Sequence, residues 1–101
     1  MATEDKTVLT ATQVDDELRT LEGWTRSGNV LARNFVFGNF RDITSFLNHL
    51  TLTIADQDHH PDFSLNTGMR MVAVALTTHS AKALTRSDIL FARTLNQWSP
   101  A

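Results

Sequence analysis

The stretch FRDITSFLNHLTLTIAD, residues 40–56, decides the fold because it carries the clearest helical pattern in the chain. Its apolar residues recur at the spacings that place side chains on one face of an α-helix: Ile43, Phe46, Leu47, Leu50 and Ile54. Asn39 stands just before the stretch and is a candidate N-cap, since its side chain can accept from free amides of the first turn. We therefore predict a helix over residues 40–56.

Two predicted β-hairpins flank this helix. The first joins residues 24–26 to residues 30–37 through Ser27-Gly28-Asn29, and the second joins residues 63–66 to residues 69–78 through Asn66-Thr67-Gly68. Both turns contain glycine and asparagine, which tolerate the left-handed backbone that tight turns require. The strand segments are rich in β-branched and aromatic residues or alternate in character, as expected for a sheet.

Two further helices are predicted at the ends of the chain. Thr10 and Gln13 have capping-box spacing, and a stripe of Val14, Leu18 and Leu21 up to Gly23 predicts a helix over residues 11–22. Thr85 and Asp88 have N-cap and N3 spacing, so the third helix begins after Thr85. The order α-β-β-α-β-β-α predicts an α+β fold, with three helices packed on one face of a four-stranded antiparallel sheet.

Composition narrows the class of protein. The 101 residues allow one domain, and a formal net charge of −2 argues against nucleic-acid binding through bulk positive charge. The absence of cysteine excludes disulfides and thiolate zinc sites, and no apolar run approaches the ~20 residues that span a bilayer. We expect a cytoplasmic globular domain, with no membrane partner, that would bury more surface by forming oligomers.

Three of the four histidines fall in the polar parts of the chain. His59 and His60 stand in Asp58-His59-His60-Pro61-Asp62, and His79 stands in Thr77-Thr78-His79-Ser80. In a hairpin the end of one strand lies beside the start of its partner, so His79 is expected near His59 and His60. The residues alone leave three interpretations open: acid–base catalysis, a metal site made of histidines, or surface histidines without chemistry.

Other candidate site residues have simpler alternative explanations. Asp58 can orient an imidazole but also fits an exposed loop, and Phe63 can stack on a flat ligand but also fits a core. Asp88 is first a helix cap and only second a candidate for the site. His49 lies on the polar side of the 40–56 helix, where a surface histidine without chemistry is expected.

These motifs together resemble the pterin-4a-carbinolamine dehydratase family. The resemblance rests on Asp58-His59-His60-Pro61 with Asp62 and Phe63, then Thr77-Thr78-His79, then Leu84-Thr85 with Asp88. It implies a single domain over residues 9–98, with residues 1–8 as a flexible N-terminus. By position it implies His59, His60 and His79 as catalytic residues, with Asp58, Phe63, Thr78 and Asp88 as substrate contacts.

The implied activity is the removal of water from a 4a-hydroxy-tetrahydropterin to give a quinonoid dihydropterin, with no metal or organic cofactor. The resemblance also implies assembly into homodimers or homotetramers. The alternative is a non-catalytic relative that serves as a dimerisation or assembly cofactor for another protein, of the transcription-factor or Rubisco type. Two departures from the family pattern are Ala55, where an acidic or polar residue is usual, and Lys82, where a small residue is usual.

Overall fold

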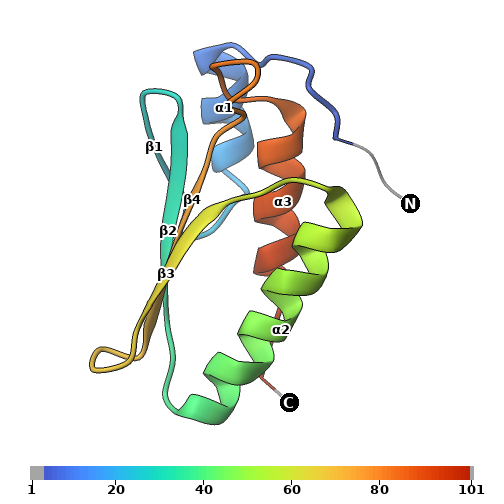
Figure 1. Cartoon of the computed structure of the whole chain (residues 1–101). Coiled ribbons are helices and arrows are strands. Elements are labelled where there is room, and N and C mark those ends of the chain that lie inside the picture. The colour runs from blue at the N-terminus through green and yellow to red at the C-terminus, as the bar shows by residue number, and fades with distance from the viewer. Residues whose placement is uncertain (1–3, 101) are drawn as a thin grey trace.

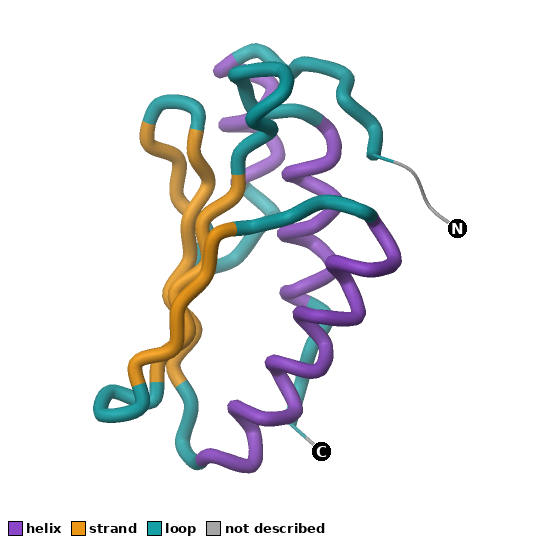
Figure 2. Tube along the Cα trace, in the orientation of Figure 1, coloured by secondary structure: helices purple, strands orange, loops and turns teal. Residues whose placement is uncertain are grey.

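The computed structural model describes residues 4–100 and has an α+β fold, in which three helices cover one face of a four-stranded antiparallel sheet (Figure 1). The elements are α1 (Ala11–Leu18), β1 (Thr25–Ser27), β2 (Val30–Val36), α2 (Phe40–Gln57), β3 (Asp62–Asn66), β4 (Met71–Leu76) and α3 (Arg86–Asn96). Figure 2 shows the two layers, in which the sheet face that points away from the helices is open. The predicted fold class and element order are confirmed.

The strand order of the sheet is β1-β2-β4-β3, so β4 lies inside the sheet and β3 forms an edge. The β3–β4 register pairs Asp62 with Ala75 and Asn66 with Met71. The start of β3 therefore lies beside the end of β4. This pairing brings the segment that follows α2 next to the segment that follows β4, as the predicted second hairpin required.

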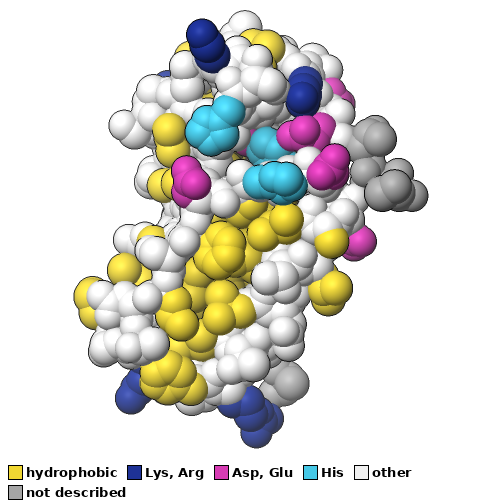
Figure 3. Space-filling model, viewed as in Figure 1, with side chains coloured by type: hydrophobic (Ala, Val, Ile, Leu, Met, Phe, Trp, Pro, Cys, Tyr) yellow, Lys and Arg dark blue, Asp and Glu magenta, His cyan; other side chains and the backbone are white. Residues whose placement is uncertain are grey.

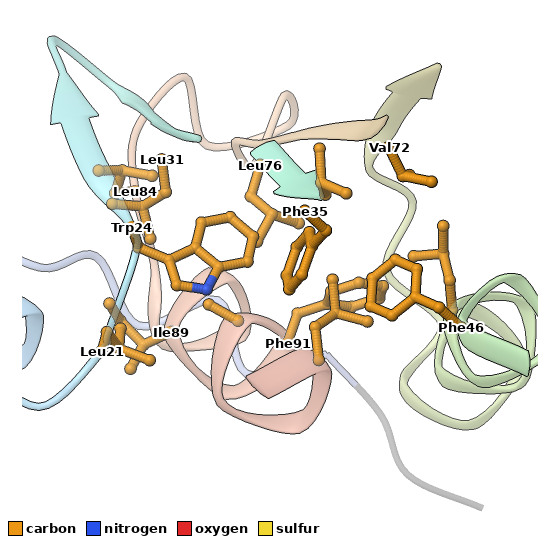
Figure 4. Close-up of a cluster of buried hydrophobic side chains, with 14 of the residues drawn as sticks. Leu21, Trp24, Leu31, Phe35, Phe46, Val72, Leu76, Leu84, Ile89 and Phe91 are labelled. Atoms are coloured by element: carbon orange, nitrogen blue, oxygen red, sulfur yellow. The ribbon is translucent and has the colours of Figure 1, made fainter. Parts of the chain in front are cut away.

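The core lies between the sheet and the helices (Figure 4). Phe46 of α2 and Phe91 of α3 are fully buried, together with Leu31 of β2 and Leu76 of β4. Each such side chain contributes about 1.5–3 kcal/mol when it leaves water. Val72, Val74 and Leu76 of β4 are buried and so form the face of the strand that lies toward the helices.

The structure corrects the predicted bounds of two elements. Helix α1 ends at Leu18 and not near residue 22, and the chain continues in turns in which the Trp24 amide donates to the Leu21 carbonyl. Leu21 is still buried, so its burial and not helical structure explains its place in the apolar pattern. Strand β4 spans Met71–Leu76 and not residues 69–78. It begins later than predicted because Arg70 adopts a left-handed turn conformation with φ of 50°.

Residues 4–9 follow a defined path along the loop that precedes α3, and we call them the N-terminal strap. Its backbone carbonyls at Asp5 and Thr7 accept hydrogen bonds from the amides of Ser87 and Arg86, and the Leu9 amide donates to the Leu84 carbonyl. Of the flexible terminus expected at residues 1–8, residues 4–8 thus have specific partners, while residues 1–3 lie outside the described residues. None of the described helices is long and apolar enough to cross a bilayer.

Candidate functional site

A cavity of about 310 Å³ opens where β3 begins and β4 ends. Three segments supply its walls: the N-terminal strap, the loop after α2 and the segment after β4. In that order the lining residues are Glu4, Lys6, Asp58, His59, His60, Thr77, Thr78, His79 and Ser80. The predicted gathering of His59, His60 and His79 is therefore present. Figure 3 shows histidine and acidic side chains together above a hydrophobic surface.

The end of α2 gives the two adjacent histidines different environments. Asp58 is the C-cap and adopts the left-handed conformation, with φ of 48°, which is uncommon for a residue with a side chain. After this change of direction, His59 is 3% exposed, whereas the side chain of His60 is 74% exposed. One imidazole is thus held inside the protein and its neighbour is left at the surface of the cavity.

Both ring nitrogens of His59 contact carboxylates. Nε2 lies 2.6 Å from Oδ1 of Asp88 in α3, and Nδ1 lies 2.5 Å from Oε2 of Glu4 in the strap. Asp88 is completely buried and does not line the cavity, whereas Glu4 does. The Nδ1 side of the ring is therefore the side that faces the cavity.

The second oxygen of Asp88 fixes the loop before α3. Its Oδ2 accepts from the Thr78 hydroxyl at 2.8 Å and from the Thr85 amide at 2.9 Å, which confirms the predicted pairing of Thr85 with Asp88 at the helix start. The hydroxyls of Thr78 and Thr85 lie 2.7 Å apart, and both residues are buried. Asp88 thus caps α3 and orients His59 at the same time.

Burial of His59 lowers its pKa, because an imidazolium is costly to desolvate, but the carboxylates act in the opposite direction. The hydrogen bonds to Asp88 and Glu4, together with their negative charges, raise the pKa above the ordinary value of 6.5. An ionised carboxylate can only accept, so each ring nitrogen that contacts one must carry a proton. The surroundings of His59 accordingly favour the imidazolium form.

The other predicted site residues lie in different places. His79 is exposed and lines the cavity, and Asp58 Oδ1 lies 3.5 Å from His60 Nε2. Phe63 does not line this cavity: it pairs with buried Val74, so it lies on the helix-facing side of the sheet edge and is 43% exposed. The interpretation of Phe63 as a core residue is therefore wrong, because β3 is an edge strand that the helices do not cover.

Two residues at the cavity, Glu4 and Lys6, were not predicted from the sequence. They belong to a short polar segment without periodicity, and nothing in its pattern indicates contact with residues more than fifty positions later. Lys82, one of the two departures from the family pattern, does not line the cavity. His49 lies outside the cavity, but it is partly buried and not a free surface residue, since its Nε2 lies 2.7 Å from the Thr94 carbonyl of α3.

Within residues 4–100, no group of three or more histidine or acidic side chains is arranged to hold a metal ion. The divergence of His59 and His60 accounts for this, because adjacent side chains with such different exposure do not converge on one point. What the arrangement offers chemically is several imidazoles around one cavity, which can donate and accept protons near neutral pH.

The fold and the cavity define a small α+β protein with histidines gathered at one end of an antiparallel sheet. The family model described as Pterin 4 alpha carbinolamine dehydratase matches residues 7–98. The chain therefore belongs to the pterin-4a-carbinolamine dehydratase family, as the resemblance of its motifs implied.

Individual relatives agree with this assignment. A protein of Thermomicrobium roseum named "Putative pterin-4-alpha-carbinolamine dehydratase" is 38% identical over 77% of this chain and 82% of its own length. A protein of the same name from Sulfurisphaera tokodaii is 33% identical over 88% of this chain and 94% of its own length. A crystal structure from Brucella melitensis, described as "transcriptional coactivator/pterin dehydratase", is similar with a TM-score of 0.82 at 32% identity, covering 89% of this chain and 96% of that one.

Proposed function

We propose that this protein is a dehydratase that removes water from a 4a-hydroxy-tetrahydropterin to give a quinonoid dihydropterin. The observation that carries the proposal is the single cavity that His59, His60 and His79 line, with His59 oriented by the buried carboxylate of Asp88. Membership of the family supports the same reaction class. The chemistry is an elimination that needs one proton donor and one proton acceptor.

The proposed reaction divides these roles between histidines. One imidazole gives a proton to the hydroxyl that leaves C4a, and another removes the proton from the adjacent ring nitrogen, so that water departs and a C=N double bond forms. His59 and His79 are proposed for the proton transfers, and His60 for binding or for a share of them. The reaction requires no change of oxidation state and no cofactor.

The surroundings of the cavity support a flat bicyclic substrate. Hydrophobic side chains lie directly below the histidines in Figure 3. Phe63 and Leu65 of β3 lie on the helix-facing side of this edge and are about two-fifths exposed, at 43% and 41%. A pterin ring has apolar faces and a polar rim. We propose that the substrate extends beyond the cavity to Phe63, which contacts one of its faces, while Asp58 and Thr78 act near the polar end inside the cavity. Asp88 then acts through His59, since it is fully buried.

The test is a stopped-flow absorbance assay with a 4a-hydroxy-tetrahydropterin. We expect a rate enhancement by the wild type that falls by about 10²–10⁴-fold in His79→Ala and in His59→Gln. His49→Gln is the matched control, because His49 contacts Thr94 outside the cavity and its replacement should leave the rate near that of the wild type. A wild-type protein that does not exceed the buffer rate would contradict the proposal.

A second candidate function is that of a dimerisation or assembly cofactor for another protein. The description of the Brucella melitensis structure, which names a transcriptional coactivator as well as a dehydratase, favours it. The open face of the sheet also supports it, since Ala32, Ala73 and Ala75 present small side chains there. A pull-down from an extract of the source cells with the His79→Ala protein tests this function, and recovery of no stoichiometric partner would contradict it.

We also propose that the protein forms a homodimer or a homotetramer. Strand β3 has β4 on one side, and all five of its residues are exposed. An exposed edge strand with apolar side chains favours pairing with another strand. A second copy of the chain would supply such a strand and would cover Phe63 and Leu65.

A further inference from the structure

Glu4 is held at the cavity by the backbone of the strap and not by its own side chain alone. The Asp5 carbonyl accepts from both the amide and the hydroxyl of Ser87, at 2.9 and 2.8 Å, and the Thr7 carbonyl accepts from the Arg86 amide at 3.0 Å. These bonds attach the residues next to Glu4 to the first turn of α3, which also carries Asp88. The strap and the helix start therefore present their carboxylates to the same imidazole.

The two carboxylates differ in their access to the cavity. Asp88 is 0% exposed and contacts the inner nitrogen, Nε2, whereas Glu4 lines the cavity and contacts the outer nitrogen, Nδ1. Because both partners are acceptors when ionised, both contacts require a proton on the ring. His59 in this arrangement has a proton to give toward the cavity and no lone pair with which to take one.

We propose that Glu4 is a positioning residue of the dehydration, which keeps a proton on Nδ1 of His59 and so makes His59 the acid of the reaction. This inference rests on the proposed function. As substrate enters, the C4a hydroxyl takes the Nδ1 proton in place of Glu4, the C4a–O bond breaks and water leaves. The second imidazole removes the proton from the adjacent ring nitrogen, whose electron pair forms the C=N double bond.

Besides Glu4 and Asp88, a few charged or titratable groups near the cavity can affect the titration of His59. Lys6 lies in the strap with its Nζ 3.6 Å from Glu4 Oε1, so its positive charge stands beside the carboxylate that contacts His59. The exposed Asp58–His60 pair lies on the loop after α2, and His79 lines the same cavity. The groups to be followed in a titration are therefore Glu4, Lys6, Asp58, His60, His79 and Asp88.

The experiment combines NMR titration of the imidazole nitrogens with the pH profile of kcat/KM, on the full chain. The variants are Glu4→Gln, which removes the charge, and Glu4→Asp, which keeps it. Asp5→Asn is the matched control, since it removes one charge from the same strap while its side-chain oxygen still accepts from Thr7. We expect Glu4→Gln to lower the pKa of His59, to move the alkaline limb of kcat/KM to lower pH, and to lower kcat about tenfold at neutral pH, less than loss of an imidazole would.

Glu4→Asp is expected to restore part of kcat, and Asp5→Asn to leave both profiles unchanged. The proposal is overturned if the His59 titration and the kcat/KM profile of Glu4→Gln superimpose on those of the wild type. A wild type without dehydratase activity would overturn the proposed function, and with it the catalytic role of Glu4. In that case the NMR titration still decides whether Glu4 controls the protonation of His59, so the two failures are distinguishable.

Discussion

At the scale of single residues, Asp88 connects stability to the candidate site. Its two oxygens hold the imidazole of His59, the hydroxyl of Thr78 and the amide of Thr85, all of them buried. A buried carboxylate is costly unless such partners surround it. The same partners fix the orientation of the imidazole, so a change at Asp88 should affect folding and chemistry together.

We expect Asp88→Asn to lower the free energy of unfolding by about 2–3 kcal/mol. Both oxygens of the carboxylate accept hydrogen bonds, whereas the NH2 group of an amide can only donate, so at least one of the three donors loses its acceptor. Urea unfolding followed by circular dichroism measures the change. Asp42→Asn is the matched control, since Asp42 also lies in the first turn of its helix but is only partly buried, and it should cost less than about 1 kcal/mol. Equal losses in the two variants would contradict the role assigned to Asp88.

The titration of His59 should appear in the stability of the protein. The pKa of His59 in the folded state lies above the ordinary value, so the folded state binds a proton more tightly than the unfolded state does. The resulting stabilisation is complete below the unfolded pKa of about 6.5 and is lost as pH rises through the folded pKa.

Relative to His59→Gln, the wild type should therefore have a larger advantage in unfolding free energy near pH 6 than near pH 9. Urea unfolding of both proteins across this range measures the difference, and the variant corrects for all groups that the two proteins share. An advantage that grows toward alkaline pH would mean that burial, and not the two carboxylates, dominates the environment of His59.

The histidines at the site could be predicted from the sequence, whereas the carboxylate partners could only partly be predicted. His59, His60 and His79 stand at turns around one hairpin, and strand pairing alone brings them together. Asp88 was expected mainly as a helix cap. The contact of Glu4 with His59 depends on the path of the strap over α3, which no local pattern of side chains encodes.

At the scale of elements, the connections explain where the predicted bounds were right and where they were wrong. Helix α2 was predicted to within a residue because its apolar stripe and its Asn39 cap agree. Helix α1 was predicted too long because Leu21 continues the periodic pattern from within a turn. Burial of an apolar side chain satisfies the pattern whichever backbone conformation supplies it.

The connection from α1 to β1 contains a glycine, Gly23, at which both the backbone conformation and the available space exclude a larger residue. Gly23 has φ of +85°, and an added Cβ would lie 2.5 Å from Nε of Arg33, whose Nη1 donates to the Glu22 and Asn96 oxygens. We expect Gly23→Ala to lower the free energy of unfolding by about 3 kcal/mol, from backbone strain and displacement of that guanidinium. Gly28→Ala is the matched control.

Gly28 also has positive φ, at +58°, but an added Cβ there meets nothing within 4 Å. Its replacement should cost only the strain of about 1–2 kcal/mol. Thermal or urea unfolding of the two variants separates the backbone term from the steric term. Indistinguishable losses would show that Arg33 moves aside without cost.

At the scale of the whole molecule, the sheet has one covered face and one open face, and its two edges differ. The β1 edge has only three residues, while the β3 edge has five, with Phe63 and Leu65 on the side toward the helices. The longer edge is thus the better template for another strand. The sequence indicated that a domain of this size gains by association, but it could not indicate which edge would take part.

Light scattering after size-exclusion chromatography should give a mass that is two or four times 11.3 kDa. Leu65→Lys, on the β3 edge, should shift the protein toward the monomer, because a charged side chain on an edge opposes strand pairing. Met69→Lys is the matched control, since Met69 is exposed in the same hairpin but lies beyond the paired strand. A monomeric wild type, or equal effects of the two variants, would contradict the proposed use of this edge.

The strap has a practical consequence for anyone who prepares this protein. A purification handle fused ahead of Glu4 would begin within a few residues of the imidazoles, and its bulk or its own histidines would compete with the native carboxylate there. Helix α3 leads the chain away from that end of the molecule, as Figure 1 shows, so a handle at the C-terminal side of the sequence avoids this problem. The choice of fusion end therefore decides whether an assay reports on the native centre or on an altered one.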